Sequence, residues 1–155
     1  MIPRFGIAPE PARRYRRRPG AYAILLREGR VLLTHQAEPE PEFQLPGGGI
    51  DPGEGPIAAL HREVMEETGW TISTPRRIGA YRRFCYMPEY DLHAEKLCSV
   101  WLARPVMRLA PPLEPGHEAH WVPLDRASAL LPDPGSRAAL GLVLARADRS
   151  YRNCR

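Results

Sequence analysis

Cysteine and long apolar runs are both scarce in this sequence. The cysteines are Cys85, Cys98 and Cys154, an odd number without CxxC spacing, which disfavours a disulfide framework and a cysteine zinc site. No stretch approaches the roughly 18 apolar residues of a membrane span, and the N-terminus lacks the apolar run of a secretory signal. We therefore expect a protein of a reducing compartment, located in the cytoplasm, without a membrane partner.

Neither sign of charge is in large excess. Lys and Arg number 22 against 18 Asp and Glu, which gives a net charge of +4, and the basic residues are almost all arginine. The positions of the arginines are therefore more informative than the total charge. At 155 residues, against a typical domain size of roughly 150, we expect one domain over residues 1–155.

The first 19 residues form a lead-in rich in proline and arginine, with arginines at positions 13, 14, 16, 17 and 18. Such a basic run can bind nucleic acid or another acidic substrate. More often it is a solvated, flexible terminus. We expect a solvated terminus. RNA is therefore a possible partner, but not the favoured one.

A proline and a glycine delimit a helix near the middle of the chain. Pro56 suits the first helical turn and Gly69 suits the position after the last one, which predicts a helix over about residues 56–68. The helical period makes one face apolar, so this face can pack while another points into a cleft. The apolar stripe consists of Ile57, Leu60, Val64 and Thr68.

Three glutamates, Glu63, Glu66 and Glu67, lie near the end of this predicted helix. Their spacing brings the three carboxylates to one face, where they repel one another and the negative end of the helix dipole. A bound divalent cation would reverse this penalty, and oxygen-only ligands suit Mg²⁺, with Mn²⁺ as a substitute. The alternative is a solvated acidic face without a ligand.

Three consecutive glycines, Gly47, Gly48 and Gly49, precede the helix. Without side chains, this backbone can approach a ligand closely and expose its amides and carbonyls. Alone, the glycines would indicate a flexible turn. Next to an acidic helix, they predict a loop that binds phosphate and metal.

Apolar runs rich in β-branched and aromatic residues predict strands around this helix. We expect a hairpin formed by residues 21–27 and 31–35, a polar loop over residues 87–95, and a short helix capped by Asp125 that ends at Leu131. The other expected strands are residues 43–45, 70–74, 78–86 and 96–106, and the last expected helix is residues 136–147.

This order of elements predicts an α+β fold with a mixed sheet covered on both faces, because strands alternate with helices and are joined partly by hairpins. The expected core residues are Ile24, Leu26, Val31, Leu33, Val64, Val100, Leu102 and Val122.

The stretch from Gly48 to Trp70 resembles the signature of the Nudix hydrolase family. Five residues separate Gly48 from Glu54, and seven more precede the run R-E-V-M-E-E-T-G-W that starts at Arg62. Trp70 stands where the family usually has an aliphatic residue, a change that concerns local packing. The resemblance implies an α/β/α sandwich with a mixed, mostly antiparallel sheet, and a hydrolase acting on phosphorus-containing anhydrides.

The resemblance also implies roles for individual residues. Glu63, Glu66 and Glu67 would be metal ligands together with the Gly48 carbonyl. Glu54 and Arg62 would organise the loop and the helix, although Arg62 can equally form a helix salt bridge with Glu66, four residues later.

A further acid follows the second proline-rich loop. Glu118 lies shortly before Trp121-Val122-Pro123-Leu124, where many Nudix hydrolases have an acid that serves as a metal ligand or general base. The alternative is a surface acid. By spacing alone, Glu66, Glu67 and Glu118 could each deprotonate the attacking water.

The five histidines have no metal-ligand spacing, and we expect them at the surface or in packing positions. They are His35, His61, His93, His117 and His120.

Three functions are compatible with this resemblance. The first is a metal-dependent pyrophosphohydrolase that cleaves a diphosphate linkage in a nucleoside diphosphate derivative, of the nucleotide or dinucleotide type. The second is an RNA 5′-end pyrophosphohydrolase, and the third is a noncatalytic nucleotide-sensing module. The complete acidic set favours an enzyme, because a binding module does not need such costly clustering of charge. A homodimer is an open alternative to a monomer.

Overall fold

The computed structural model describes the backbone of residues 1–152 and the side chains of residues 1–147. Its central sheet has seven strands in the order β3-β2-β1-β7-β6, with β4 paired to β1 and β9 paired to β2. These strands are β1 (Arg16–Arg27), β2 (Arg30–Gln36), β3 (Glu42–Gln44), β4 (Gly47–Gly49), β6 (Arg76–Met87), β7 (Leu92–Ala103) and β9 (His117–Pro123). A separate two-stranded sheet joins β5 (Trp70–Ile72) to β8 (Pro105–Arg108).

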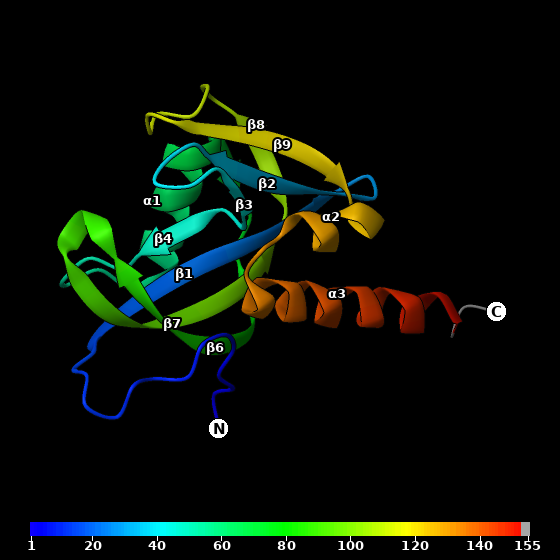
Figure 1. Ribbon diagram of the computed structural model, residues 1–155. Coiled ribbons are helices and arrows are strands. Elements are labelled where there is room, and N and C mark those ends of the chain that lie inside the picture. The colour runs from blue at the N-terminus through cyan, green and yellow to red at the C-terminus, as the bar shows by residue number, and fades with distance from the viewer. Residues whose placement is uncertain (153–155) are drawn as a thin grey trace.

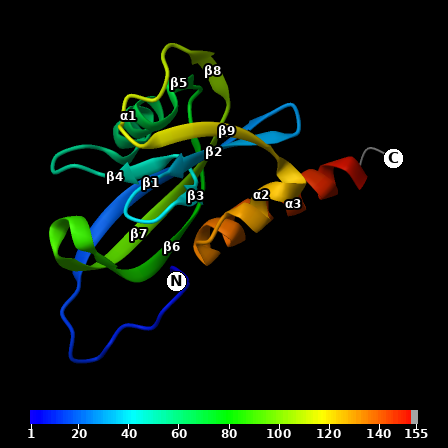
Figure 2. The same cartoon turned by 45° about the horizontal axis from the view of Figure 1, so that its top comes forward.

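The helices cover both faces of the central sheet (Figures 1 and 2). Helix α1 (Pro56–Thr68) lies on one face, and α2 (Leu124–Leu130) and α3 (Pro134–Arg152) lie on the other. Strand β1 is parallel to β7, and the other pairings in this sheet are antiparallel. The predicted α/β/α sandwich with a mixed, mostly antiparallel sheet is therefore confirmed.

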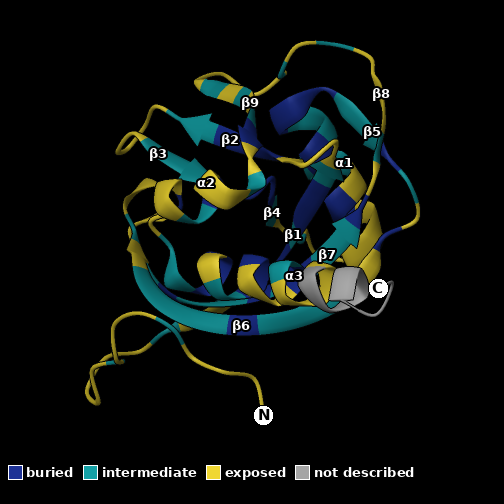
Figure 3. Cartoon of the chain, turned by 90° about the vertical axis from the view of Figure 1, so that its right-hand side faces the viewer, coloured by how far each residue is buried: buried dark blue, intermediate teal, exposed yellow. Residues whose placement is uncertain are grey.

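Strand β1 supplies side chains to both core layers because successive residues of a strand point to opposite faces. Ala23 and Leu25 pack with Leu60 and Val64 of α1. Ile24 belongs to the other layer, which α2 and α3 cover. Figure 3 shows the buried segments gathered between the sheet and its helices.

The predicted core is largely confirmed. Six of its members are buried, namely Ile24, Val31, Leu33, Val64, Val100 and Val122. Leu26 and Leu102 are only partly buried and pack at the edge of the layer beneath α3.

Helix α1 has the predicted limits. Pro56 occupies its first turn, and Gly69 ends it in the left-handed conformation with φ of 74°, donating its backbone N–H to the Met65 carbonyl. The predicted hairpin is also present, with Glu28 and Gly29 at positive φ in its turn. Direct pairing between β1 and β2 is limited to the register pairs next to that turn, because β1 continues alongside β7 and β4.

The predicted polar loop over residues 87–95 is wrong. Strand β6 continues to Met87, a 3₁₀ turn spans Pro88–Tyr90, and β7 already begins at Leu92. The cross-strand partner supplies the hydrogen bonds that make this polar sequence a strand. The single strand predicted over residues 96–106 is likewise two strands, since β7 ends at Ala103 and β8 pairs with β5.

The prediction of a flexible lead-in is wrong for its last residues. Strand β1 starts at Arg16, and residues 16–18 pair in parallel with residues 94–96 of β7. Local sequence does not reveal this, because the partner lies almost 80 residues away along the chain. Residues 3–5 also hydrogen-bond to Arg82 on the outer strand of the sheet.

The two C-terminal helices differ from their predicted limits. Helix α2 begins at Leu124 with Pro123 at its N-cap, so Asp125 lies inside the first turn and is not the cap. Helix α3 begins at Pro134, earlier than predicted. Asp133 accepts a hydrogen bond from the Ser136 backbone N–H at that end.

No helix among residues 1–152 is long and apolar enough to cross a membrane. Cys85 and Cys98 are free thiols, and Cys154 lies outside the described residues.

Candidate functional site

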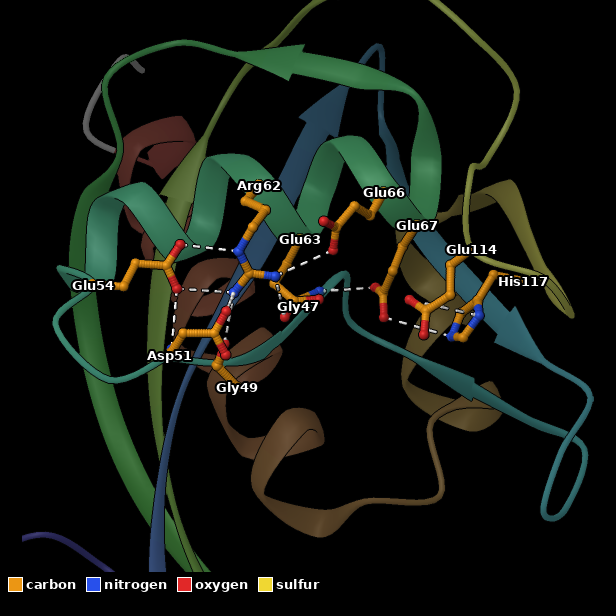
Figure 4. Close-up of polar contacts among 10 residues, drawn as sticks. All are labelled: Gly47, Gly49, Asp51, Glu54, Arg62, Glu63, Glu66, Glu67, Glu114 and His117. Carbon is orange, nitrogen blue, oxygen red and sulfur yellow. Dashed lines mark hydrogen bonds and ion pairs between the residues drawn. The ribbon is translucent and has the colours of Figure 1, made fainter. Parts of the chain in front are cut away.

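Arg62, in the middle of α1, joins the second half of this helix to the loop before it. Its guanidinium donates to both carboxylate oxygens of Glu54 at 2.9 Å, to Glu63 at 2.9 Å and to Glu66 at 3.2 Å. It also donates to the Gly49 carbonyl at 2.9 Å. The planar fork of arginine allows one side chain to satisfy these acceptors together. Figure 4 shows this arrangement along one side of α1.

The glycine loop and the buried glutamates of α1 fit closely against each other. The Gly47 backbone N–H donates to Glu67 at 3.0 Å. Gly47 has φ of 142°, and a side chain there would overlap the Ala21 carbonyl oxygen. A Cβ on Gly48 would lie 2.5 Å from the Glu63 carboxylate carbon. Gly47 therefore requires glycine, whereas a side chain at Gly48 would displace the Glu63 carboxylate, so the lack of side chains lets the loop lie close to the acids.

The loop between β8 and β9, far from α1 in the sequence, meets the end of this helix. The backbone N–H groups of Leu113 and Glu114 both donate to the Glu66 carbonyl, at 2.7 and 3.0 Å. This carbonyl is near the C-terminus of the helix, where carbonyls lack partners within the helix. The loop therefore holds Glu114 and His117 next to Glu67.

Glu67, Glu114 and His117 form a cluster in which one side-chain donor atom of each lies within 4.8 Å of the others. His117 Nε2 lies 3.5 Å from Glu67 Oε1, and His117 Nδ1 lies 3.9 Å from Glu114 Oε2. His117 was expected in a surface or packing role, and Glu114 was not singled out in the sequence. Neither has a recognisable spacing from the helix acids, so only the folded loop brings them together.

Burial and Arg62 have opposite effects on the carboxyl groups. Burial raises the pKa of Glu67 well above its ordinary value, although the Gly47 N–H opposes this. Burial also raises the pKa of Glu63, against the hydrogen bond from Arg62. The hydrogen bond from Arg62 lowers the pKa of Glu54 to about 2. The carboxylates of Glu67 and Glu63 thus lack enough nearby positive charge to offset their burial. The negative charge of Glu54 is fully offset by Arg62.

Glu118 does not join the helix acids. Residues 117, 119 and 121 of β9 face α1, since Ala119 and Trp121 pack with its core layer and His117 approaches Glu67. Glu118 points to the other face, is 72% exposed and pairs with His120 at 3.1 Å. Glu66 is intermediate in exposure between Glu67 and Glu118, since its side chain is 41% exposed, and it pairs with Arg62.

A cavity of about 380 Å³ opens beside the acids. One end carries the glycine loop with Glu63, Glu67, Glu114 and His117. The turn between β6 and β7, which lies beside β4 in Figures 1 and 2, forms another wall. This wall and the adjoining strands contribute Arg18, Arg83, Cys85, Tyr86, Met87, Tyr90 and Lys96. The volume lies within the range of small-molecule sites, roughly 300–1,000 Å³.

The donor set fits a divalent cation. Carboxylate oxygens and an imidazole nitrogen are suitable ligands, and the Nδ1 atom of His117 is buried without a hydrogen-bond partner. A buried polar nitrogen without a partner is costly unless a ligand satisfies it, and an unprotonated ring nitrogen can bind a cation. Glu67, Glu114 and His117 could therefore hold a cation, with Glu63 lining the same cavity and Glu66 at the exposed edge.

Comparison with known proteins gives a consistent result. The family model described as NUDIX domain matches residues 16–141. The solved structure of a NUDIX hydrolase from Nitrosomonas europaea superposes with a TM-score of 0.70 at 21% identity, covering 84% of this chain and 90% of that one. At this identity the match shows the fold alone.

Two curated relatives match over shorter regions. A Bacillus subtilis (strain 168) protein, provisionally named as an 8-oxo-dGTP diphosphatase, is 38% identical over 47% of this chain and 49% of its own length. An RNA pyrophosphohydrolase from Mesorhizobium japonicum is 50% identical over 30% of this chain and 31% of its own length. The chain thus spans half or less of the length of these relatives.

Proposed function

Since the chain belongs to the NUDIX domain family, we propose that it is a metal-dependent pyrophosphohydrolase that cleaves a diphosphate linkage in a nucleoside diphosphate derivative. The observation that carries this proposal is the buried carboxylate of Glu67, placed between the glycine loop and the Glu114–His117 pair at the end of an open cavity. The family match and the names of the relatives support a hydrolase of phosphorus-containing anhydrides.

We propose Mg²⁺ as the cofactor, with Mn²⁺ as a substitute. Glu63, Glu67, Glu114 and His117 would hold it, with Glu66 and the Gly48 carbonyl nearby. When bound, the cation would neutralise the diphosphate oxygens and lower the pKa of a water molecule. We propose Glu67 as the group that takes the proton from the attacking water, because the Gly47 N–H holds its carboxylate at the edge of the cavity.

The other residues prepare this site. Gly47 N–H fixes the Glu67 carboxylate, and the space beside Gly49 is open to a diphosphate. Arg62 holds Glu54, Glu63 and the loop carbonyl of Gly49 in one arrangement. Catalysis of phosphoryl transfer depends mainly on such positioning and on charge stabilisation.

A panel of nucleoside triphosphates, dinucleoside polyphosphates and nucleotide sugars tests this function, with Mg²⁺ present and products identified by mass spectrometry. We expect cleavage between two phosphorus atoms and full loss of activity with excess chelator. Products that retain every diphosphate link, or full activity in chelator, would overturn the proposal. A noncatalytic sensing role would instead give binding without products.

We expect Glu114→Gln to lower kcat by about 10–100-fold, the range found when groups around a metal are changed. Glu118→Gln is the matched comparison, because it makes the same chemical change on β9 away from the cavity, and we expect less than a twofold effect. Steady-state kinetics with Mg²⁺ at saturation measures both. If kcat fell strongly in Glu118→Gln and stayed unchanged in Glu114→Gln, Glu118 rather than Glu114 would be the further acid of the active site.

A further inference from the structure

Three cations lie next to one another on three neighbouring strands. Arg18 of β1 is the register partner of Lys96 on β7, and Lys96 is in turn the partner of Arg83 on β6. Register partners project from the same face of a sheet, and adjacent strands are about 4.8 Å apart. We call these residues the cationic row. All three line the same cavity as Glu63 and Glu67.

The row is incompletely neutralised. Arg83 lies 3.4 Å from Asp133, and Arg18 stacks over the Tyr90 ring at 4.9 Å. In the described part of the chain, Lys96 has no ion pair within 4.0 Å. The Nε atom of Arg83 is buried without a hydrogen-bond partner. Like charges directly opposite each other destabilise a sheet, so this arrangement favours an anionic ligand.

The acids near the cationic row do not fully neutralise it, because they bond to other groups or form no ion pair with it. Asp133 also accepts hydrogen bonds from Tyr81 and Ser136. Glu42 lines the cavity but accepts from Gln44, and Glu89 lies at the turn without an ion pair to the row. The same cavity is therefore lined both by the cationic row and by the acids of α1 and the neighbouring loop.

We propose that the cationic row binds a phosphate group of the substrate other than the scissile diphosphate. This rests on the proposed function, since it assumes that the diphosphate lies at the acidic end. The ligand would be a nucleoside 5′-polyphosphate with another phosphate on its ribose. That phosphate is either a terminal monoester or the phosphodiester that leads to a second nucleotide. Arginine forks and a lysine ammonium together match the oxygens of such a group.

The kinetic test uses three substrates that share one base, namely the base of the triphosphate that the nucleotide panel shows to be cleaved best. They are the 5′-triphosphate, its 3′-phosphorylated form and the 5′-triphosphorylated dinucleotide. We expect the wild type to prefer at least one phosphate-bearing substrate by about tenfold in kcat/KM, as for one charged hydrogen bond. The preference should fall with added salt, because the contact is ionic. The monoester and the dinucleotide distinguish a small-molecule substrate from an RNA 5′ end.

Lys96→Gln and Arg18→Gln should each lower this preference at least severalfold. Arg76→Gln is the control, because it removes the same charge from an exposed position of β6 outside the cavity and should keep the preference. Point variants are needed, since deleting residues 1–18 would remove the start of β1. Without ligand, the melting temperature of Lys96→Gln should hold or rise, because a repulsion is relieved.

Lys96 is the only lysine of the chain, which gives a readout independent of activity. An amine-reactive acetylating reagent should label Lys96 more slowly when the preferred phosphate-bearing nucleotide is present with Ca²⁺ in place of Mg²⁺. The N-terminal amine is the internal reference in the same mass spectrum. Equal protection by the plain triphosphate and the phosphate-bearing nucleotide would contradict the proposal.

The outcomes separate the two proposals. If no substrate is hydrolysed, the proposed function fails. If the plain triphosphate is hydrolysed and the wild type shows no preference for a further phosphate, the role of the cationic row fails alone. A preference that survives in Lys96→Gln and Arg18→Gln would also overturn that role.

Discussion

Glu67→Gln is expected to lower kcat by about 10³-fold, as for loss of a positioned general base, while the protein stays folded. The amide of glutamine can still accept the Gly47 N–H through its oxygen, so the contact between helix and loop persists. The buried negative charge is lost, and with it the group that we propose as metal ligand and proton acceptor. Kinetics with a good panel substrate and circular dichroism measure activity and fold.

The same substitution should change how stability depends on pH. Because burial raises the folded-state pKa of Glu67 above its ordinary value of 4.5, the folded state holds this proton more tightly than the unfolded state. The resulting stability is full below about pH 4.5 and is lost as pH rises through the folded-state pKa. We therefore compare the free energy of unfolding at about pH 5 and about pH 8 in the presence of chelator. The wild type should lose more stability between these two pH values than Glu67→Gln loses.

Magnesium gives an independent check of the site. Mg²⁺ should raise the melting temperature of the wild type, and increasingly so as its concentration exceeds the dissociation constant. This shift should be largely absent in Glu67→Gln. Glu40→Gln, in an exposed loop, is the charge-matched control and should behave as wild type. A normal kcat in Glu67→Gln, or an equal Mg²⁺ shift in both proteins, would remove Glu67 from the metal site.

Arg62→Met is expected to cost about 2 kcal/mol of stability, since hydrogen bonds to charged groups contribute about 1.5–3 kcal/mol. For a domain of this size, the melting temperature should then fall by roughly 4–8 °C. Arg62 serves three carboxylates and the Gly49 carbonyl, so its loss leaves several acceptors without a donor. Misplacement of the loop by about 1 Å can lower kcat about 10²-fold. Thermal melts and kinetics test both effects.

The loss of stability in Arg62→Met should also depend on pH. Because Arg62 lowers the pKa of Glu54 to about 2, the stability from this pair is present above the ordinary pKa of 4.5 and is lost as pH falls through about 2. The difference between wild type and Arg62→Met should therefore narrow in acid. Arg126→Met, on the exposed side of α2, is the control for loss of one helix arginine. A melting temperature equal to wild type at neutral pH would reduce Arg62 to an ordinary surface ion pair.

The sequence by itself determined the helix and its loop. Pro56 and Gly69 mark the ends of α1 because one lacks a backbone N–H and the other accepts a left-handed conformation. The period of the helix brings Glu63 and Glu67 to the same side, and the glycines before it are explained by a close backbone approach. These features depend on neighbours within a few turns, and the family signature covers the same stretch.

Only the tertiary structure decided what surrounds this helix. Glu114 and His117 reach Glu67 because a proline-rich loop docks on the Glu66 carbonyl, whereas the alternation of β9 turns Glu118 away. The cationic row exists only because β1, β7 and β6 pair in one register. Contacts of this kind join residues far apart in the chain, and their register is set by packing of the whole sheet rather than by local sequence pattern.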